Sequence, residues 1–95
     1  MDNKKLLNLM KLLDNLIEQG ATIQSFDFEQ RKIHQSVYLS RPDFIRLHKG
    51  KTVTISQIGI MSYKHKIDDD YISVQCFSSA PSPPDIKVTI GDEYE

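Results

Sequence analysis

The chain has 95 residues and a formal net charge of -1, and 39% of its residues are hydrophobic. A chain of this length normally makes one domain with one modest core, and this hydrophobic content is too high for a disordered protein. Its apolar runs are too short to span a membrane, and the single cysteine, Cys76, excludes an intrachain disulfide framework. These features predict a cytoplasmic protein with a reduced thiol.

Residues 3–19 have the clearest periodicity in the chain. Their apolar side chains fall within about 120° of a helical wheel: Leu6, Leu9, Met10, Leu13, Leu16 and Ile17. Polar residues interrupt them at helical spacing, which is typical of an amphipathic helix and not of a secretory signal. Asn3 is a candidate N-cap, and Gly20 suits the left-handed position after a helix. Leu7 and Leu12 flank the stripe, either as partly exposed edges of one core face or as a second contact with another subunit or partner.

Alternation with a period of two begins after Gly20 and predicts a β-hairpin. In residues 22–28 the two Phe residues share one face. In residues 33–39 the apolar and polar residues occupy opposite faces, with Ile33, Val37 and Leu39 on one and His34, Ser36 and Tyr38 on the other. The polar residues 29–32 between the two segments suit a short loop.

A short helix is predicted after Ser40, near residues 41–49. Ser40 can cap its first turn, Pro42 suits that turn, and Asp43 is an acid three residues after the cap. A helix of this length is not stable alone, so it must pack on the rest of the domain. The apolar side chains available for that contact are Phe44, Ile45 and Leu47.

Residues 52–60 predict a strand with an irregularity. Its apolar side chains change parity along the segment, which contains Val53, Ile55, Ile58 and Ile60. This change predicts a bulge or a bend at Gln57 or Gly59. Residues 66–70 are then typical of a turn, and residues 71–77 alternate again with one apolar face that contains Ile72, Val74 and Cys76.

A proline- and serine-rich stretch separates the C-terminal part of the chain. Residues 78–85 favour a stiff, extended linker. Residues 1–77 are therefore predicted to form one domain, and residues 86–95 a C-terminal strand and an acidic tail. The apolar residues of that strand are Ile86, Val88 and Ile90. It can return to an edge of its own sheet, pair with a neighbouring molecule, or stay loose.

Together these segments predict an α+β fold. The N-terminal helix packs across a mostly antiparallel sheet of four or five strands, and one short extra helix lies near residues 41–49. The predicted core contains Leu6, Leu9, Met10, Leu13, Leu16, Ile17, Phe26 or Ile23, Val37, Leu39, Phe44, Leu47, Val53, Ile55, Ile72 and Val74.

The net charge near zero hides a segregation of charges along the chain. Residues 31–66 contain eight Lys and Arg residues and one acid, whereas residues 67–95 contain one Lys and seven acids. Three interpretations remain open. Neighbouring strands can balance each other within the fold, the basic stretch can bind an anionic partner, or the acidic part of one subunit can dock on the basic part of the next.

Patterns that carry site chemistry are weak. His34, His48, His65 and Cys76 lack the spacing of a metal site, and the acidic residues 68–70 lack the alternation of a calcium loop. Cys76 lies on an apolar face, where a thiol is unreactive. We therefore expect no cofactor, no metal ion and no enzyme activity. A small hydrolase or ligand-binding protein is an alternative that requires His34, His48 or Cys76 in one pocket.

The function expected from the sequence is that of a non-enzymatic protein-interaction module able to self-assemble. Its candidate contact residues are His34, Tyr38, Arg41, Arg46, Lys49, Ile86, Val88 and Ile90, of which the last three could add a strand to a partner's sheet. The alternative is nucleic-acid binding through residues 31–66, with Tyr38, Tyr63 and Tyr71 as candidate stacking side chains. No contact with a membrane and no small-molecule substrate are expected.

The segment from Ile33 to Ser40, together with Phe44 and Leu47 on the helix that follows, gives the chain a family resemblance. In this segment and in the order of its elements, the chain resembles small accessory proteins of phages and mobile elements of Gram-positive bacteria. The resemblance covers about 15 residues and contains no diagnostic motif. It implies a role in virion assembly or in interference with a host or defence protein, and it assigns no functional residue.

Overall fold

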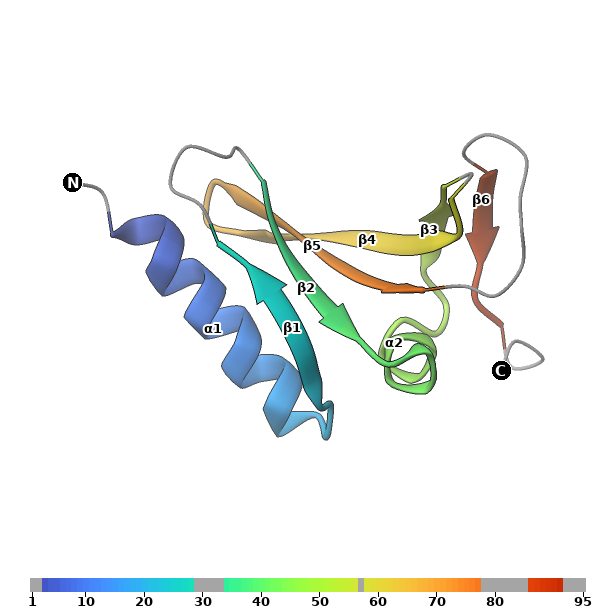
Figure 1. Cartoon of the computed structure of the whole chain (residues 1–95), viewed down its shortest axis with the longest axis horizontal. Coiled ribbons are helices and arrows are strands. Elements are labelled where there is room, and N and C mark those ends of the chain that lie inside the picture. Colours follow the sequence, from blue (N-terminus) through green and yellow to red (C-terminus); the bar gives the residue numbers. More distant parts are fainter. Residues whose placement is uncertain (1–2, 29–33, 57, 78–85, 92–95) are drawn as a thin grey trace.

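The computed structural model describes residues 3–28, 34–56, 58–77 and 86–91, without the side chains of His34 and Ile86. The described residues form two helices and six strands (Figure 1). In chain order these are α1 (Lys4–Glu18), β1 (Ile23–Asp27), β2 (His34–Leu39), α2 (Arg41–Leu47), β3 (Thr52–Ile55), β4 (Ile60–Ile67), β5 (Asp70–Phe77) and β6 (Ile86–Thr89).

The strands form one sheet in the order β1-β2-β5-β4-β3-β6. Four of the five neighbouring pairs are antiparallel, and the central pair of β2 and β5 is parallel. The α+β class, the N-terminal helix and the mostly antiparallel pairing are as predicted, but the sheet includes one parallel pair and has six strands where four or five were expected. The parallel pair arises because β5 lies between β2 and β4, after the chain has passed through α2, β3 and β4 (Figure 1).

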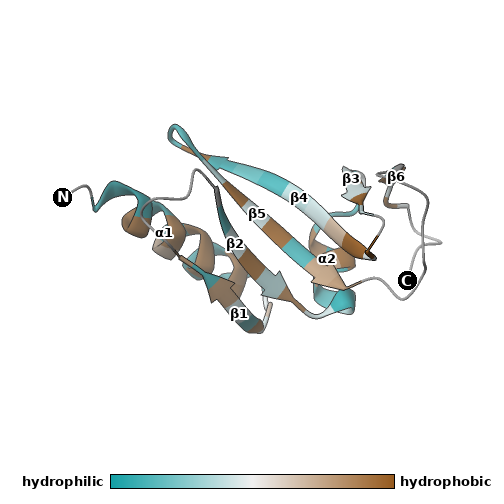
Figure 2. Ribbon diagram, turned by 45° about the horizontal axis from the view of Figure 1, so that its top comes forward, coloured by the Kyte–Doolittle hydropathy of each residue, from teal (hydrophilic) through white to brown (hydrophobic). Residues whose placement is uncertain are grey.

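Most apolar side chains of the strands point to one face of the sheet. The strand register places Val74 of β5 beside Val37 of β2 and Tyr63 of β4, and it places Ile55 of β3 beside Met61 of β4. Both helices pack on this face, because their buried side chains share one core with those of the strands. Figure 2 shows α1 and α2 behind the sheet. The other face, which we call the open face, is covered by no helix of the described part of the chain.

α1 packs on the sheet through a different stripe from the predicted one. Its buried side chains are Asn8, Leu9, Leu12 and Leu16. The expected core residues Leu6, Met10 and Ile17 are instead 38%, 51% and 56% exposed, and Leu13 is partly buried. Of the two flanking leucines, Leu12 is buried and Leu7 is exposed. The prediction was wrong because the apolar arc of the helix is wider than its contact with the sheet, so the wheel alone does not show which part is covered.

The rest of the predicted core is largely confirmed. The buried members are Val37, Leu39, Phe44, Val53, Ile55, Ile72 and Val74. Ile23 is partly buried against the core, whereas Phe26 is 54% exposed at the edge strand. Leu47 is also only partly buried. The core includes several side chains absent from the predicted set, namely Leu12, Ala21, Ile45, Met61, Cys76 and Ile90.

α2 begins as predicted and is fastened to the end of α1. The hydroxyl of Ser40 accepts a hydrogen bond from the backbone N–H of Asp43 at 3.4 Å. The Asp43 carboxylate accepts a bond from the Thr22 N–H at 3.1 Å, and this bond is the main cause that holds the pKa of Asp43 below its ordinary value. Arg46 donates to the carbonyl of Gln19, the C-cap of α1, at 2.8 Å. These bonds fix the orientation of the short helix α2 relative to α1.

The change of parity after Ile55 marks a hairpin turn. β3 ends at Ile55 and β4 begins at Ile60, so the predicted single strand with a bulge is wrong and the bend is confirmed. Gly59 has a φ of 84°, a left-handed conformation that favours glycine. The N–H of Ser56 donates to the carbonyl of Ile60 at 2.9 Å and closes the turn. Gln57 lies outside the described residues.

The C-terminal strand returns to its own sheet. β6 pairs antiparallel with β3, and Ile90 beyond it is fully buried. The Ile90 N–H donates to the carbonyl of Lys51 at 3.0 Å, and the Gly50 N–H donates to the Ile90 carbonyl at 2.7 Å. Of the three open alternatives, the structure has the first, a return to the edge of the same sheet. The linker expected at residues 78–85 lies outside the described residues.

A buried polar contact fixes the N-terminal half of α1 over the sheet. Asn8, which is 1% exposed, donates through Nδ2 to Asp70 Oδ2 at 2.8 Å and to the Ile67 carbonyl at 3.3 Å. Both acceptors border the β4–β5 turn, in which Asp68 has a φ of 54°. The contact therefore ties the helix to one particular hairpin turn, which apolar packing alone does not specify.

Replacing Asn8 with Ala should lower the free energy of unfolding by roughly 1–3 kcal/mol, because two acceptors at a buried site lose their donor. Urea unfolding at neutral pH measures the change. Lys11→Ala, at an exposed position of the same helix, is the control and should change the free energy by less than about 0.5 kcal/mol. Equal stabilities of the two variants would show that the Asn8 contact contributes nothing.

Candidate functional site

Two histidines that are distant in sequence meet between α2 and β4. His48 follows α2 as its C-cap and is fully buried, and His65 lies on the helix-covered face of β4. Their Nε2 atoms are 2.9 Å apart. The ring of Phe44 stacks on His48 with centroids 4.3 Å apart, and Tyr63 lies 5.3 Å from His48 and 5.2 Å from His65. The result is a compact aromatic cluster of Phe44, His48, Tyr63 and His65.

The hydrogen bonds define the tautomers of the two rings. His48 Nδ1 lies 2.7 Å from the carbonyl oxygen of Phe44. A carbonyl can only accept, so His48 carries its proton on Nδ1 and presents a bare Nε2. The short contact between the rings then requires His65 to donate from Nε2. His48 is therefore neutral in this arrangement, since two donors facing each other at that distance would repel.

Burial is the main cause that lowers the pKa of both histidines. It lowers the pKa of His65 from 6.5 to about 4, with further electrostatic contributions from His48 and Lys51. The pKa of His48 is lowered by burial and by Lys51, although its bond to the Phe44 carbonyl acts in the opposite direction. A pair of neutral imidazoles in a packed cluster is suited to holding α2 on the sheet.

The one cysteine is not prepared for nucleophilic chemistry. Cys76 is fully buried on the helix-covered face, and burial raises the pKa of its thiol to about 11, against a smaller opposite effect of the Arg41 charge. The thiolate is the nucleophilic form, so this environment disfavours attack on a substrate. Among the described residues no group of three or more His, Cys, Asp or Glu side chains is arranged to hold a metal ion.

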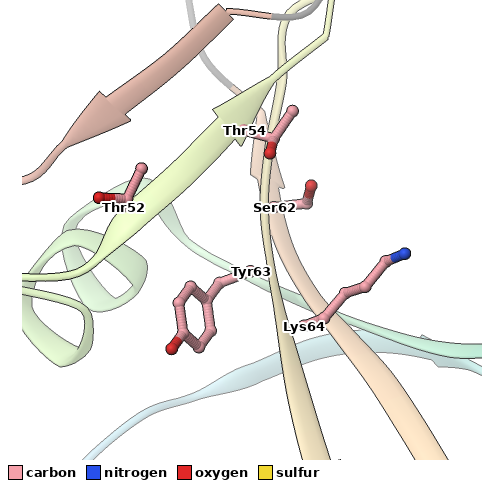
Figure 3. Close-up of a pocket in the computed structure, with 5 residues that line it drawn as sticks. All are labelled: Thr52, Thr54, Ser62, Tyr63 and Lys64. Atoms are coloured by element: carbon pink, nitrogen blue, oxygen red, sulfur yellow. The ribbon is translucent and has the colours of Figure 1, made fainter.

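A pocket of about 360 Å³ opens where β3 and β4 separate. The two strands pair only as far as Thr54 and Ser62, and beyond that point Thr52 and Lys64 no longer oppose each other closely. It is lined by Thr52, Thr54, Ser62, Tyr63 and Lys64, and Figure 3 shows Thr52 and Tyr63 on one side of β4 and Ser62 and Lys64 on the other. Its polar groups therefore do not converge on one point, and the lining contains no carboxylate or imidazole to act as a general base.

A stripe of apolar side chains on α1 runs beside the side of the helix that packs on the sheet, and its member Leu13 is partly buried against the core. It consists of Leu6, Met10, Leu13 and Ile17, which follow one another at helical spacing. Phe26 lies on the neighbouring edge strand β1, on the sheet face that α1 covers, and is also exposed. We call Leu6, Met10, Leu13 and Ile17 the α1 stripe. Contiguous exposed apolar side chains of this kind mark contact surfaces in folded proteins.

The predicted contact residues are divided among separate surfaces. Tyr38 lies on the open face of β2, and His34 belongs to the same strand, although its side chain lies outside the described part. Arg41, Arg46 and Lys49 lie in or just after α2, on the opposite side of the sheet. Arg46 is bonded to Gln19 and forms an ion pair with Asp43 at 3.3 Å.

The remaining predicted contact residues, Ile86, Val88 and Ile90, lie on and just beyond β6. Val88 is partly buried and Ile90 is fully buried in this chain's own core, while the side chain of Ile86 lies outside the described part. The structure does not gather the three predicted groups into one surface, although the bond from the Gly50 N–H to the Ile90 carbonyl brings Ile90 close to the segment that follows Lys49. Strand addition through residues 86–90 would have to use the edge of β6 that faces away from β3.

The sequence prediction missed β4 and therefore the histidine cluster. The signal was present as alternation, because the helix-covered residues Met61, Tyr63, His65 and Ile67 are separated by Ser62, Lys64 and Lys66. The two strand faces could have been found from this pattern. The meeting of His48 with His65 could not, because it depends on how α2 packs.

No protein-family model, curated protein or solved structure matches the chain. Within the described ranges, neither helix is long and apolar enough to cross a membrane. The function must therefore be argued from the chain's own surfaces.

Stability should decrease as the pH falls from about 6.5 towards 4. Over this range the unfolded chain takes up protons at His48 and His65 that the folded chain excludes, since both pKa values are lowered in the fold. After allowing for solvent screening at the partly exposed His65, we expect a loss of roughly 1–3 kcal/mol. Urea unfolding at a series of pH values measures it.

The matched variant is His65→Gln, whose side-chain amide can still donate to His48 but does not titrate. Its stability should depend less steeply on pH over the same range. An identical pH dependence in the two proteins would rule out His65 as the group responsible.

Proposed function

We propose that this protein is a non-enzymatic interaction module that self-associates through the α1 stripe. The supporting observation is that α1 is apolar on two neighbouring sides and is fully buried on only one of them, since Leu13 alone of the second side is partly buried. Leu9, Leu12 and Leu16 are buried against the sheet, whereas Met10 and Ile17 are more than half exposed. In a monomer the exposed apolar side chains of that second side do not contribute to stability. A partner surface that covers them removes apolar area from water and is therefore favourable.

The spacing of the stripe suits an antiparallel pairing of two copies of α1. Leu6, Met10, Leu13 and Ile17 recur at intervals of four, three and four residues, as in helices that pack side by side. A two-fold axis between Met10 and Leu13 brings Leu6 of each copy opposite Ile17 of the other. The same patch then meets itself, which is the requirement for a closed dimer.

The charges along α1 favour the same arrangement. Lys4, Lys5 and Lys11 lie in its N-terminal two-thirds, and Asp14 and Glu18 lie towards its C-terminus. Antiparallel helices bring the basic part of each copy alongside the acidic part of the other, whereas parallel helices would bring like charges together. The helix dipoles are also opposed in the antiparallel form. A second copy of the chain is therefore the occupant that this surface fits.

The biological setting that we propose rests on the resemblance of residues 33–40, with Phe44 and Leu47, to small accessory proteins of phages and mobile elements. Accessory proteins of phages and mobile elements act by assembling or by binding host proteins, and a self-associating domain suits either role. This setting is part of the proposal, and the pairing of α1 can be tested without it.

Sedimentation of the full chain over a concentration series should show a monomer–dimer equilibrium. Met10→Glu places a charge at the centre of the paired stripes and should shift the equilibrium to monomer at every concentration. Asn15→Glu introduces the same charge at an exposed position on another side of α1 and should leave the equilibrium unchanged. A wild-type chain that is monomeric throughout, or equal behaviour of the two variants, would refute self-association through this stripe.

Charge reversal tests the antiparallel orientation. Replacing Asp14 and Glu18 with Lys should weaken the dimer, and adding Lys4→Glu and Lys5→Glu should restore it, because both sets change sign together. The sedimentation series is the measurement, with added salt reducing the difference. Failure of the second pair to restore association would exclude the antiparallel arrangement while leaving the stripe itself in place.

A further inference from the structure

The open face of the sheet carries a regular pattern of rows that neither the core nor the α1 stripe uses. The register aligns Tyr71 of β5 with Lys66 of β4, and two residues further along it aligns Ser73 with Lys64. The next row runs across five strands and contains Tyr38, Gln75, Ser62, Thr54 and Lys87. Successive rows lie about 7 Å apart, because they are two strand residues apart.

Exposed aromatic side chains lie on the open face at both ends of β5. Phe77, at the end of β5, is 67% exposed and stacks with Tyr38, with ring centroids 5.9 Å apart and ring planes 21° apart. Tyr71, at the start of β5, is 42% exposed, and the Lys66 ammonium lies 5.9 Å from its ring centroid. Between the two aromatic positions the partly exposed residues Gln75, Ser62 and Thr54 contribute amide and hydroxyl groups, whereas Ser73 is buried and accepts a hydrogen bond from the Gln75 amide at 3.0 Å.

The charge of the open face is predominantly positive. Lys64, Lys66 and Lys87 are exposed there on β4 and β6. The acid that the register places on this face is Asp27, beside Ser36 at the β1 edge, while Asp70 is turned to the other side and bonded to Asn8. A surface of three lysines beside exposed rings attracts an anionic partner that also offers flat apolar groups.

We propose that the open face binds single-stranded nucleic acid, with bases stacked on Phe77 and Tyr71 and phosphates placed along Lys64, Lys66 and Lys87. Stacking needs unpaired bases, whose faces are free, and it tolerates any sequence. The rows between the rings provide hydroxyl and amide groups for sugar and base edges. The span from Tyr71 to Phe77 is about 20 Å along the strand, which is room for a few nucleotides of an extended chain.

The surface favours this partner over two others. A duplex hides the faces of its bases, and the described part of the open face projects no helix or β-ribbon to enter a groove. An acidic protein would use the lysines but would gain little from Phe77. The site also differs from the basic stretch 31–66 taken as a whole, because Arg41, Arg46 and Lys49 lie on the opposite side of the sheet.

Binding can be measured by the fluorescence anisotropy of labelled oligo-U and oligo-dT of about 12 nucleotides. The salt concentration is raised from about 50 to 200 mM, over which affinity should fall steeply. The two oligonucleotides separate RNA from DNA as the preferred strand, and binding to either supports the proposal. A duplex of the same length and a polyglutamate competitor represent the two disfavoured partners.

The aromatic contribution is tested by Tyr71→Ala combined with Phe77→Ala, which should weaken binding about tenfold. Phe77→Trp keeps the stacking surface and should keep the affinity. The chain contains no Trp, so this variant also adds a single fluorophore, and stacking of a base on it should quench its emission. Circular dichroism and urea unfolding confirm that each variant is folded.

The ionic contribution is tested by neutralising Lys64, Lys66 and Lys87 together to Gln. The slope of log affinity against log salt should fall by about 2, as expected for three lost phosphate contacts on a single strand. The charge-matched control replaces Lys4, Lys11 and Lys49, which are exposed on the helical side, and should keep the slope. Met10→Glu should also bind normally, so a failure of self-association is distinguishable from a failure of this site.

Several results would overturn the proposal. One is the absence of binding at about 50 mM salt, and another is equal affinity for the duplex. Unchanged affinity in the Tyr71→Ala, Phe77→Ala variant would show that charge alone acts. If polyglutamate displaced the labelled oligonucleotide as effectively as unlabelled oligonucleotide does, an acidic protein would be the better partner.

Discussion

The whole molecule depends on covering one face of a six-stranded sheet with only two helices. The strand register places the apolar residues of β2, β5, β4 and β3 on the same face, and both helices must pack there. α2 is short and depends on contacts beyond its own length, namely its joint with α1 and the aromatic cluster beneath His48. Removing either helix would expose the same continuous core, so the two are coupled through the sheet.

The proposed surfaces are consequences of that arrangement. Because both helices lie on one face, the open face is left to side chains that tolerate water, and Phe77 and Tyr71 are exposed among them. Because α1 has an apolar arc wider than its contact with the sheet, Met10 and Ile17 also remain outside. The two surfaces lie on different sides of the molecule, so a paired α1 would leave the open face accessible.

The sequence predicts the elements of this fold better than their arrangement. Local signals were sufficient for α1, for the Ser40 cap of α2, and for the alternation of residues 33–39, because each depends on neighbours in the chain. The buried side of α1 could not be predicted, because the apolar arc covers more than half of a turn. Asn8 is buried because it binds Asp70, which is about 60 residues away in the sequence. The parallel pairing of β2 with β5 was missed for the same reason.

The position of β5 has a consequence for how the chain acquires its structure during synthesis. β5 is the seventh of the eight described helices and strands in chain order. It nevertheless lies in the middle of the sheet, between β2 and β4. Until Phe77 has left the ribosome, the β1–β2 hairpin and the β3–β4 hairpin cannot join, and each keeps an unsatisfied backbone edge. Before β5 is synthesised, the nascent chain therefore consists of two separate hairpins. At that stage their unpaired edges can pair wrongly with other nascent chains on the same mRNA.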